Sequence, residues 1–186
     1  MIKNAIIFRI MKKYVESVFN KDFEKKYYKK FIKITPKGKI IDLGCGVGSA
    51  SNIFLKAGYD YVGYDIDEYH INLGKEYNPS LNISVANMVD IPNQKPKANG
   101  AVYAYSLLSL TTEEVKTSFK SCYENLVENG NVLIFVRCKD FEIKPNFYVN
   151  VIPQNELVLI LKECGFNVIY NKNLDEMTVC IIATKN

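Results

Sequence analysis

A stretch in the first third of the chain combines two carboxylates with three closely spaced glycines. Asp42 is followed by Gly44, Gly46 and Gly48, and Asp65 comes about 20 residues later. Glycine lets backbone N–H groups approach a ligand closely, and a carboxylate at the end of a buried strand can accept from ammonium or hydroxyl groups. This pattern predicts a site for a nucleoside that carries an amino acid. Asp42 would face the ammonium, and Asp65 would face the ribose hydroxyls.

The glycine spacing distinguishes this loop from a dinucleotide-binding loop. The dinucleotide fingerprint reads Gly-x-Gly-x-x-Gly and seats a pyrophosphate. Here Gly48 comes one residue early, and Ser49 takes the place of the last fingerprint glycine. The carboxylate of Asp42 would also repel a pyrophosphate, so the sequence argues against a dinucleotide ligand.

Two motifs, Asp42-Leu-Gly-Cys-Gly-Val-Gly48 and Tyr64-Asp65-Ile66-Asp67, resemble the first motifs of the Rossmann-like S-adenosylmethionine-dependent methyltransferases. The resemblance covers about residues 36–186. It implies an α/β fold with a doubly wound, mostly parallel seven-stranded sheet, helices on both faces and a C-terminal antiparallel hairpin. It also implies S-adenosyl-L-methionine as methyl donor and S-adenosyl-L-homocysteine as product. The cofactor-binding residues that it implies are Asp42, Gly44, Cys45, Gly46, Asp65, Ile66, Asn87, Met88, Ala104 and Tyr105.

Two positions depart from the pattern of that family. Asn87 stands where the family has an acidic residue that contacts the adenine amino group. An amide oxygen can still accept from that amino group, and the backbone of Met88 can still donate to the ring. Asp90 is the alternative if the register is shifted. Ser109 stands where the family commonly has a histidine.

Methyl transfer from a sulfonium is an in-line displacement, so holding the nucleophile close to the methyl group is the main requirement. No residue type is obligatory for the acceptor. We expect a small molecule, with Tyr105, Ser106, Ser109, Arg137 and Tyr148 as candidates for catalysis or the acceptor pocket. Arg137 could pair with a carboxylate or phosphate of the acceptor, or it could be a surface cation.

The sequence lacks the residues that several other classes of methyltransferase use for catalysis. Tyr105-Ser-Leu-Leu108 does not match the Asn-Pro-Pro-Tyr or Asp-Pro-Pro-Tyr motif of the enzymes that methylate amino groups of DNA or glutamine. Neither a carboxylate set for a catechol-type metal site nor a cysteine arrangement for cytosine C5 chemistry is apparent, so we expect no metal. His70, the single histidine, is predicted to lie on a helix surface rather than to act as a base.

Charge is unevenly distributed along the chain. Residues 1–40 contain 12 lysines and arginines against 3 acidic residues, so they carry +9 and the remainder −5 of the net +4. This segment is either a solvated lysine-rich face or an arm that attracts an anionic substrate such as RNA. The chain has only two arginines, which argues against RNA. A cofactor-binding partner subunit without activity is the third hypothesis.

Short apolar runs alternate with amphipathic stretches, which is typical of an α/β domain. Residues 1–35 are predicted to form a helical cap in front of a methyltransferase domain at 36–186. Its apolar residues are mostly expected to make core contacts, although the resemblance implies that Tyr14, Tyr27 or Tyr28 could touch the ligand. Strands are expected at 40–43, 61–64, 83–86, 100–105, 132–136, 166–170 and 177–184. Helices are expected at 49–57, 67–77, from a capping box at Thr111 to about Glu128, and from Pro153 to Glu163.

Length and composition fit one ordinary globular domain of 186 residues. No apolar run approaches the roughly 20 residues needed to cross a bilayer, and the first residues lack the pattern of a signal peptide. The five cysteines are widely spaced and include no Cys-x-x-Cys pair, which argues against disulfides and a zinc site. We therefore expect a cytoplasmic protein without membrane contact; the residues assign no oligomeric state.

Overall fold

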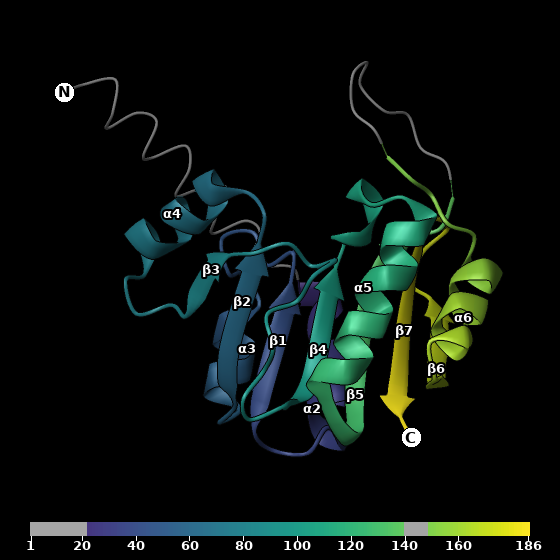
Figure 1. Cartoon of the computed structure of the whole chain (residues 1–186), viewed down its shortest axis with the longest axis horizontal. Coiled ribbons are helices and arrows are strands. Elements are labelled where there is room, and N and C mark those ends of the chain that lie inside the picture. The colour runs from purple at the N-terminus through teal and green to yellow at the C-terminus, as the bar shows by residue number, and fades with distance from the viewer. Residues whose placement is uncertain (1–21, 140–148) are drawn as a thin grey trace.

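The computed structural model describes residues 22–139 and 149–186 (Figure 1). The described residues form one seven-stranded sheet in the order β3-β2-β1-β4-β5-β7-β6. Strands β1 to β5 pair in parallel, and β7 runs antiparallel to both β5 and β6. The predicted Rossmann-like sheet with a C-terminal antiparallel hairpin is therefore confirmed. The strands are β1 (Lys39–Leu43), β2 (Asp60–Asp65), β3 (Ile83–Val85), β4 (Ala98–Ala104), β5 (Leu126–Arg137), β6 (Phe166–Asn173) and β7 (Thr178–Lys185).

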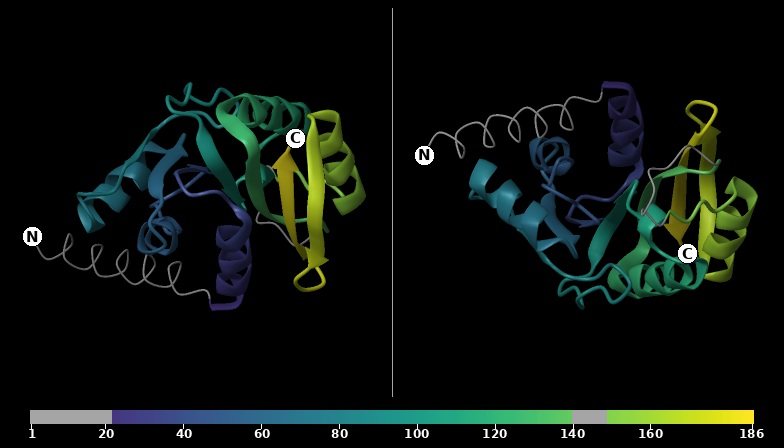
Figure 2. Two further views of the ribbon diagram at one scale, coloured as in Figure 1. Left: turned by 90° about the horizontal axis from the view of Figure 1, so that it is seen from below. Right: turned by 90° about the horizontal axis from the view of Figure 1, so that it is seen from above.

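Helices cover both faces of the sheet, as Figure 2 shows. They are α2 (Asp22–Ile34), α3 (Ser51–Lys56), α4 (Glu68–Tyr77), the 3-10 helix η1 (Leu107–Ser109), α5 (Thr112–Asn125) and α6 (Gln154–Glu163). Neighbouring residues of a strand point to opposite faces. Ile40 accordingly joins the cluster under α2, α3 and α4, whereas Ile41 joins the cluster under α5 and α6. Both side chains are fully buried, because a sheet covered on both faces needs apolar residues at successive positions.

Two predicted helix starts are confirmed by their caps. The side chain of Asp67 accepts a hydrogen bond from the backbone N–H of Tyr69 at 2.9 Å, at the start of α4. At the start of α5, the backbone N–H of Thr111 donates to Glu114 at 2.8 Å, and Thr111 accepts from the N–H of Glu114. These contacts satisfy N–H groups that a helix terminus leaves without partners.

The prediction that the helix after Thr111 runs to about Glu128 is wrong. Helix α5 ends at Asn125, and β5 begins at the next residue. The buried Asn125 side chain accepts from the backbone N–H of Gln94 at 2.7 Å, which fixes this corner. Leu126 then pairs with Ala98, so the chain is already in the sheet before the turn at Asn129.

Helix α2 packs directly on the sheet. Phe31 is fully buried, and the rings of Tyr27 and Tyr28 lie 6.3 and 5.3 Å from the ring of Phe135 in β5. The described part of the predicted cap segment therefore contributes to the core, while Tyr14 lies outside the described residues. The domain boundary at residue 35 stays a prediction. None of the helices described here is long and apolar enough to cross a membrane.

Candidate functional site

The carboxyl ends of the parallel strands bring the predicted site residues to one edge of the sheet, where open α/β sheets bind ligands. In Figure 1 the arrowheads of β1, β2 and β4 point to this edge. The glycine loop follows β1, Asp65 ends β2, Asn87 and Met88 follow β3, Tyr105 follows β4, and Arg137 ends β5.

The glycine loop is folded back onto β2 by its own backbone. The N–H groups of Gly44 and Cys45 both donate to the carbonyl of Tyr64, at 2.8 and 2.9 Å. Gly44 has a φ of +76°, and a Cβ there would overlap with Ser106. Gly46 has a φ of +54°, but among the described residues nothing lies within 4 Å of the Cβ position. The loop therefore packs tightly at Gly44 and presents bare backbone to open space at Gly46.

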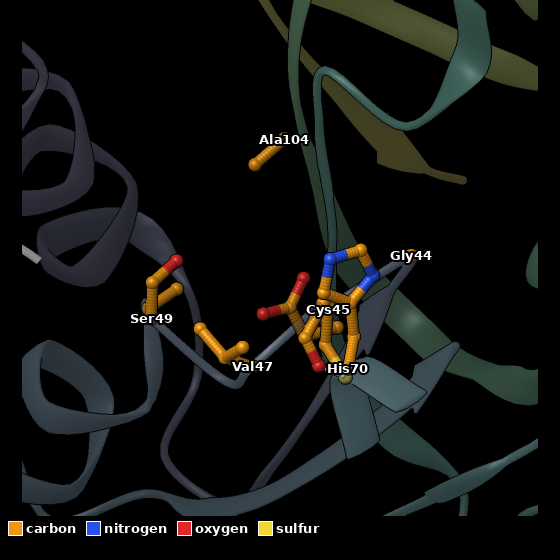
Figure 3. A pocket seen from close by; sticks show the side chains of 9 residues that line it. Gly44, Cys45, Val47, Ser49, His70 and Ala104 are labelled. Carbon is orange, nitrogen blue, oxygen red and sulfur yellow. Dashed lines mark hydrogen bonds between the residues drawn. The ribbon is translucent and has the colours of Figure 1, made fainter. Parts of the chain in front are cut away.

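A cavity of about 150 Å³ opens between this loop and the end of β4 (Figure 3). This volume is smaller than the roughly 300–1,000 Å³ of pockets that enclose a whole drug-sized ligand, so it suits one end of a longer molecule. Figure 3 shows Val47 and Cys45 along the loop and Ala104 across the cavity from them. The lining residues are Asp42, Gly44, Cys45, Gly46, Val47, Ser49, Ala50, His70 and Ala104.

Asp42 is the buried carboxylate of this cavity. Its Oδ2 accepts a hydrogen bond of 2.6 Å from the Tyr61 hydroxyl, but Oδ1 has no hydrogen-bond partner among the described residues. Burial raises the pKa of the Asp42 carboxyl to about 7; the bond from Tyr61 lowers it, and the charge of Asp65 raises it further. A buried acceptor without a donor costs free energy, so the site favours a ligand that brings a donor to Oδ1.

Asp65 ties β2 to the glycine loop. Its Oδ2 accepts from the N–H of Gly46 at 2.7 Å, and its Oδ1 accepts from the N–H of Asp67 at 2.9 Å. Each carboxylate oxygen can accept more than one hydrogen bond, so capacity for ribose hydroxyls remains. Ile66 follows at the same edge and is 65% exposed.

The turn after β3 uses the Asn87 amide locally. Its Oδ1 accepts from the backbone N–H of Val89 at 3.0 Å, which stabilises the turn. Met88 is buried beneath the loop, and its carbonyl accepts from Ser118. Both Asn87 and Asp90, the two alternatives for the adenine contact, are exposed in this turn.

His70 lies at the cavity, which the sequence reasoning missed. It is partly exposed, as predicted, but its ring lines the cavity and its Nδ1 lies 2.9 Å from Asp67. The signal was its place in the first turn of a helix that begins directly after a strand at the ligand edge. The contact with the Asp67 carboxylate therefore holds this ring at the cavity, close to the glycine loop.

Among the acceptor-side candidates, Tyr105 has the most unusual environment. Its φ is +63°, a conformation that bulky residues rarely adopt. Its ring stacks on Phe135 with centroids 6.1 Å apart, and its hydroxyl donates to Glu24 at 2.8 Å. Burial, and then the Glu24 charge, raise the pKa of the Tyr105 phenol well above its ordinary value. The hydroxyl is therefore neutral and fixed in position.

The other candidates differ in how they are held. The Ser106 hydroxyl donates to the carbonyl of Leu43 at 2.6 Å and so joins the ends of β4 and β1. Ser109 is exposed and donates to the carbonyl of Ser106 at 3.2 Å. Arg137 is half-buried at the end of β5. Tyr148 lies outside the described residues, and among those described no cluster of three or more histidine, cysteine or acidic residues could hold a metal.

A family model described as a methyltransferase domain matches residues 40–130, which include the glycine loop, Asp65 and Tyr105. Residues 40–130 therefore carry a methyltransferase domain of the S-adenosylmethionine-dependent type. S-adenosyl-L-methionine, the methyl donor of these enzymes, is the cofactor that the resemblance implied, and the buried Oδ1 of Asp42, an acceptor without a donor among the described residues, fits a ligand with an ammonium group.

Among curated proteins, the chain is 30% identical over 151 residues to a Haemophilus influenzae (strain 10810) protein described as probable S-adenosyl-L-methionine-dependent methyltransferase TehB. The match covers 78% of this chain and 52% of the relative, so the chain spans about half the length of that protein.

Solved structures share the fold at low identity. The PH0226 protein from Pyrococcus horikoshii OT3 superposes with a TM-score of 0.79 at 17% identity, over 89% of each chain. A structure described as SAM-dependent methyltransferases from Methanosarcina mazei superposes with a TM-score of 0.70 at 19% identity, over 82% of this chain and 95% of that one. At these identities the likeness supports the fold and leaves the acceptor to be argued from the site.

Proposed function

We propose that this chain transfers the methyl group of S-adenosyl-L-methionine to a small-molecule acceptor. The observation that carries the proposal is Asp42, a buried carboxylate that lines the cavity and whose Oδ1 has no hydrogen-bond donor among the described residues. A ligand ammonium would supply that donor, and a charge-assisted hydrogen bond is about twice as strong as a neutral one.

The remaining cofactor-side residues extend this assignment along the sheet edge. We assign the amino acid end of the cofactor to the cavity beside Gly44, Cys45 and Gly46, and the ribose to Asp65. The exposed side chain of Ile66 and the turn at Asn87 and Met88 would flank the adenine. Ala104 and Tyr105 would close the opposite wall.

The cofactor supplies an activated methyl group, so the protein needs to orient the acceptor and exclude water. A nucleophilic acceptor such as an amine, a thiol or a heteroatom anion needs no strong base. Ser106 is engaged in joining β1 to β4, and Ser109 is exposed. Tyr105 and Arg137 are therefore the acceptor-side residues that we favour, since both follow or end strands at the ligand edge.

RNA is a second candidate acceptor because one face of α2 is rich in lysine. Lysines 25, 26, 29, 30 and 33 are all exposed on this helix. Two of them lie over aromatic rings: Lys26 is 4.9 Å from the ring centre of Tyr27, and Lys30 is 4.6 Å from that of Tyr170. Each phosphate that such a face neutralised would steepen the dependence of binding on salt.

Transfer of labelled methyl groups separates these candidates. The protein is incubated with methyl-labelled S-adenosyl-L-methionine and either a small-molecule filtrate of a cell extract or purified total RNA. The proposal expects label in the small-molecule fraction and none in RNA after nuclease treatment and precipitation. Label in RNA alone would favour the second candidate. S-adenosyl-L-homocysteine binding without labelled product in either fraction would favour a non-catalytic partner subunit.

A further inference from the structure

Helix α2 contributes a buried carboxylate that is bonded to Tyr105, one of the acceptor-side candidates. Glu24 is 6% exposed, whereas the lysines of the same helix are exposed. Its Oε1 accepts from the Tyr105 hydroxyl at 2.8 Å. None of the ion pairs found among the described residues includes Glu24. A carboxylate removed from water is costly unless it is compensated, and one bond from a neutral phenol compensates it only in part.

Tyr105 fixes this carboxylate relative to the cavity. It directly follows Ala104, which lines the cavity. Its backbone N–H donates to the carbonyl of Phe135 at 2.8 Å, and its ring stacks on the same residue. A bulky residue at φ +63° persists only where its surroundings hold it, and functional sites commonly contain such residues. The hydroxyl, and with it Glu24, therefore has a set place relative to Ala104 in the cavity wall.

Two carboxylates act on the same region of the protein. The pKa of the buried Tyr28 phenol is raised first by burial and then by the charges of Asp42 and Glu24. Tyr28 therefore lies within electrostatic reach of both groups. The charges of Asp175 and Arg137 also act on the pKa of Tyr105, and they oppose each other because Asp175 raises it and Arg137 lowers it. The charges of Asp42 and Glu24 therefore reach the same buried ring beneath α2, on the side opposite its exposed lysines.

We propose that Glu24 makes the site prefer the positively charged methyl donor over its neutral product. This inference rests on the proposed function. The donor and the product share the adenosine and the amino acid, and they differ in one methyl group and the positive charge on sulfur. Asp42, facing the ammonium, would serve both ligands equally. Glu24 is held instead by Tyr105, the residue next to Ala104 of the cavity wall, and a negative charge there would favour only the donor, so the product would leave more readily after transfer.

The test compares dissociation constants for S-adenosyl-L-methionine and S-adenosyl-L-homocysteine, measured by calorimetry. The variant Glu24→Gln keeps an oxygen that can accept from Tyr105 but removes the charge. It should weaken donor binding about tenfold and product binding less than about twofold, since a unit charge several ångströms away acts on this scale inside a protein. Glu124→Gln, on the exposed surface of α5, makes the same change in net charge and should alter neither constant.

Two further measurements keep the inference falsifiable. Tyr105→Phe removes the hydrogen bond but keeps the Glu24 charge, so the donor preference should persist. If Glu24→Gln does not fold, the double variant Glu24→Ala with Tyr105→Phe removes both partners and should lose the preference. Equal weakening of both ligands, or an unchanged ratio, would overturn the role of Glu24. A wild-type protein that binds neither ligand would instead overturn the proposed function.

Discussion

The two halves of the ligand edge are built in different ways. On the β1–β2 side, which we call the backbone-built half, backbone N–H groups fix the glycine loop. Those of Gly44, Cys45 and Gly46 all donate to residues of β2. On the β4–β5 side, which we call the side-chain-built half, hydrogen bonds from side chains to distant elements hold the site. Tyr105 reaches Glu24, 81 residues away, and Ser106 reaches Leu43, 63 residues away. The first half therefore follows from a local motif, whereas the second depends on the folded chain.

Substitution of Gly44 or Gly46 by alanine should have the largest effect on the backbone-built half. Gly44→Ala would place a Cβ into Ser106 at a positive φ, so we expect a loss of about 3 kcal/mol of unfolding free energy. Gly46→Ala meets only open space and the unfavourable φ, so it should lose about 1–2 kcal/mol. Both should weaken binding of S-adenosyl-L-homocysteine. Denaturant titration and calorimetry would check this, and equal stability of the two variants would contradict the packing described.

Asp65→Ala tests the link between β2 and the ligand. It removes a carboxylate that we assign to the ribose, and hydrogen bonds to a charged group contribute about 1.5–3 kcal/mol. Binding of S-adenosyl-L-homocysteine should weaken at least about tenfold. Asp90→Ala, in the exposed turn after β3, is the matched control and should bind normally. The reverse pattern would mean that Asp90 holds the nucleoside.

The pKa of Asp42 predicts a pH dependence confined to the backbone-built half. Because this pKa is raised to about 7, the carboxyl of the ligand-free protein is increasingly neutral below pH 7. A neutral carboxyl attracts an ammonium less, so affinity for S-adenosyl-L-homocysteine should be lower at pH 6 than at pH 8. In Asp42→Asn, binding should be weak at both values. Unchanged wild-type affinity across this range would contradict the assignment.

The same shift has a consequence for stability. A carboxyl whose pKa is raised on folding binds more protons in the folded state than in the unfolded one. Its contribution to the free energy of unfolding therefore falls as the pH rises from about 4 to 7. Asp42→Asn should remove that component of the slope in denaturant titrations at several pH values. An identical slope in both proteins would show that another group is responsible.

The smallest effects on stability are expected from replacing Ser106 and Ser109, the two serines of the side-chain-built half. Ser106→Ala loses the hydrogen bond to Leu43 and leaves a carbonyl without that donor, so it should cost about 1 kcal/mol. Ser109 is exposed, and Ser109→Ala should stay within about 0.5 kcal/mol. If Ser109→Ala abolished methyl transfer without a loss of stability, the acceptor would lie further along η1 than we infer.

The backbone-built half could be predicted because its signals are local. Glycines with positive φ, a strand before them and a carboxylate on the next strand all appear within one short stretch. The Asp67 cap and the capping box at Thr111 were predictable for the same reason. The mostly parallel seven-stranded sheet with its C-terminal antiparallel hairpin was expected from the resemblance to a known family.

The side-chain-built half depends on contacts between residues far apart in the sequence, and no sequence motif predicts these contacts. Nothing near Glu24 in the sequence indicates a bond to Tyr105, and the lack of a donor at Oδ1 of Asp42 depends on Tyr61 donating to Oδ2 instead. The end of α5 was predicted wrongly because the Asn125 side chain is bonded by Gln94, far away in the sequence. His70 was placed on the surface because its approach to the cavity depends on how α4 packs.

The most direct test of the account is thermal unfolding with S-adenosyl-L-homocysteine, with NAD as the control ligand. A ligand at about 100 times its dissociation constant stabilises a protein by roughly 2.7 kcal/mol. For a chain of this size the account predicts a rise in Tm of about 5–10 °C with S-adenosyl-L-homocysteine and none with NAD. A rise with NAD alone, or with neither ligand, would contradict the assignment of the cavity.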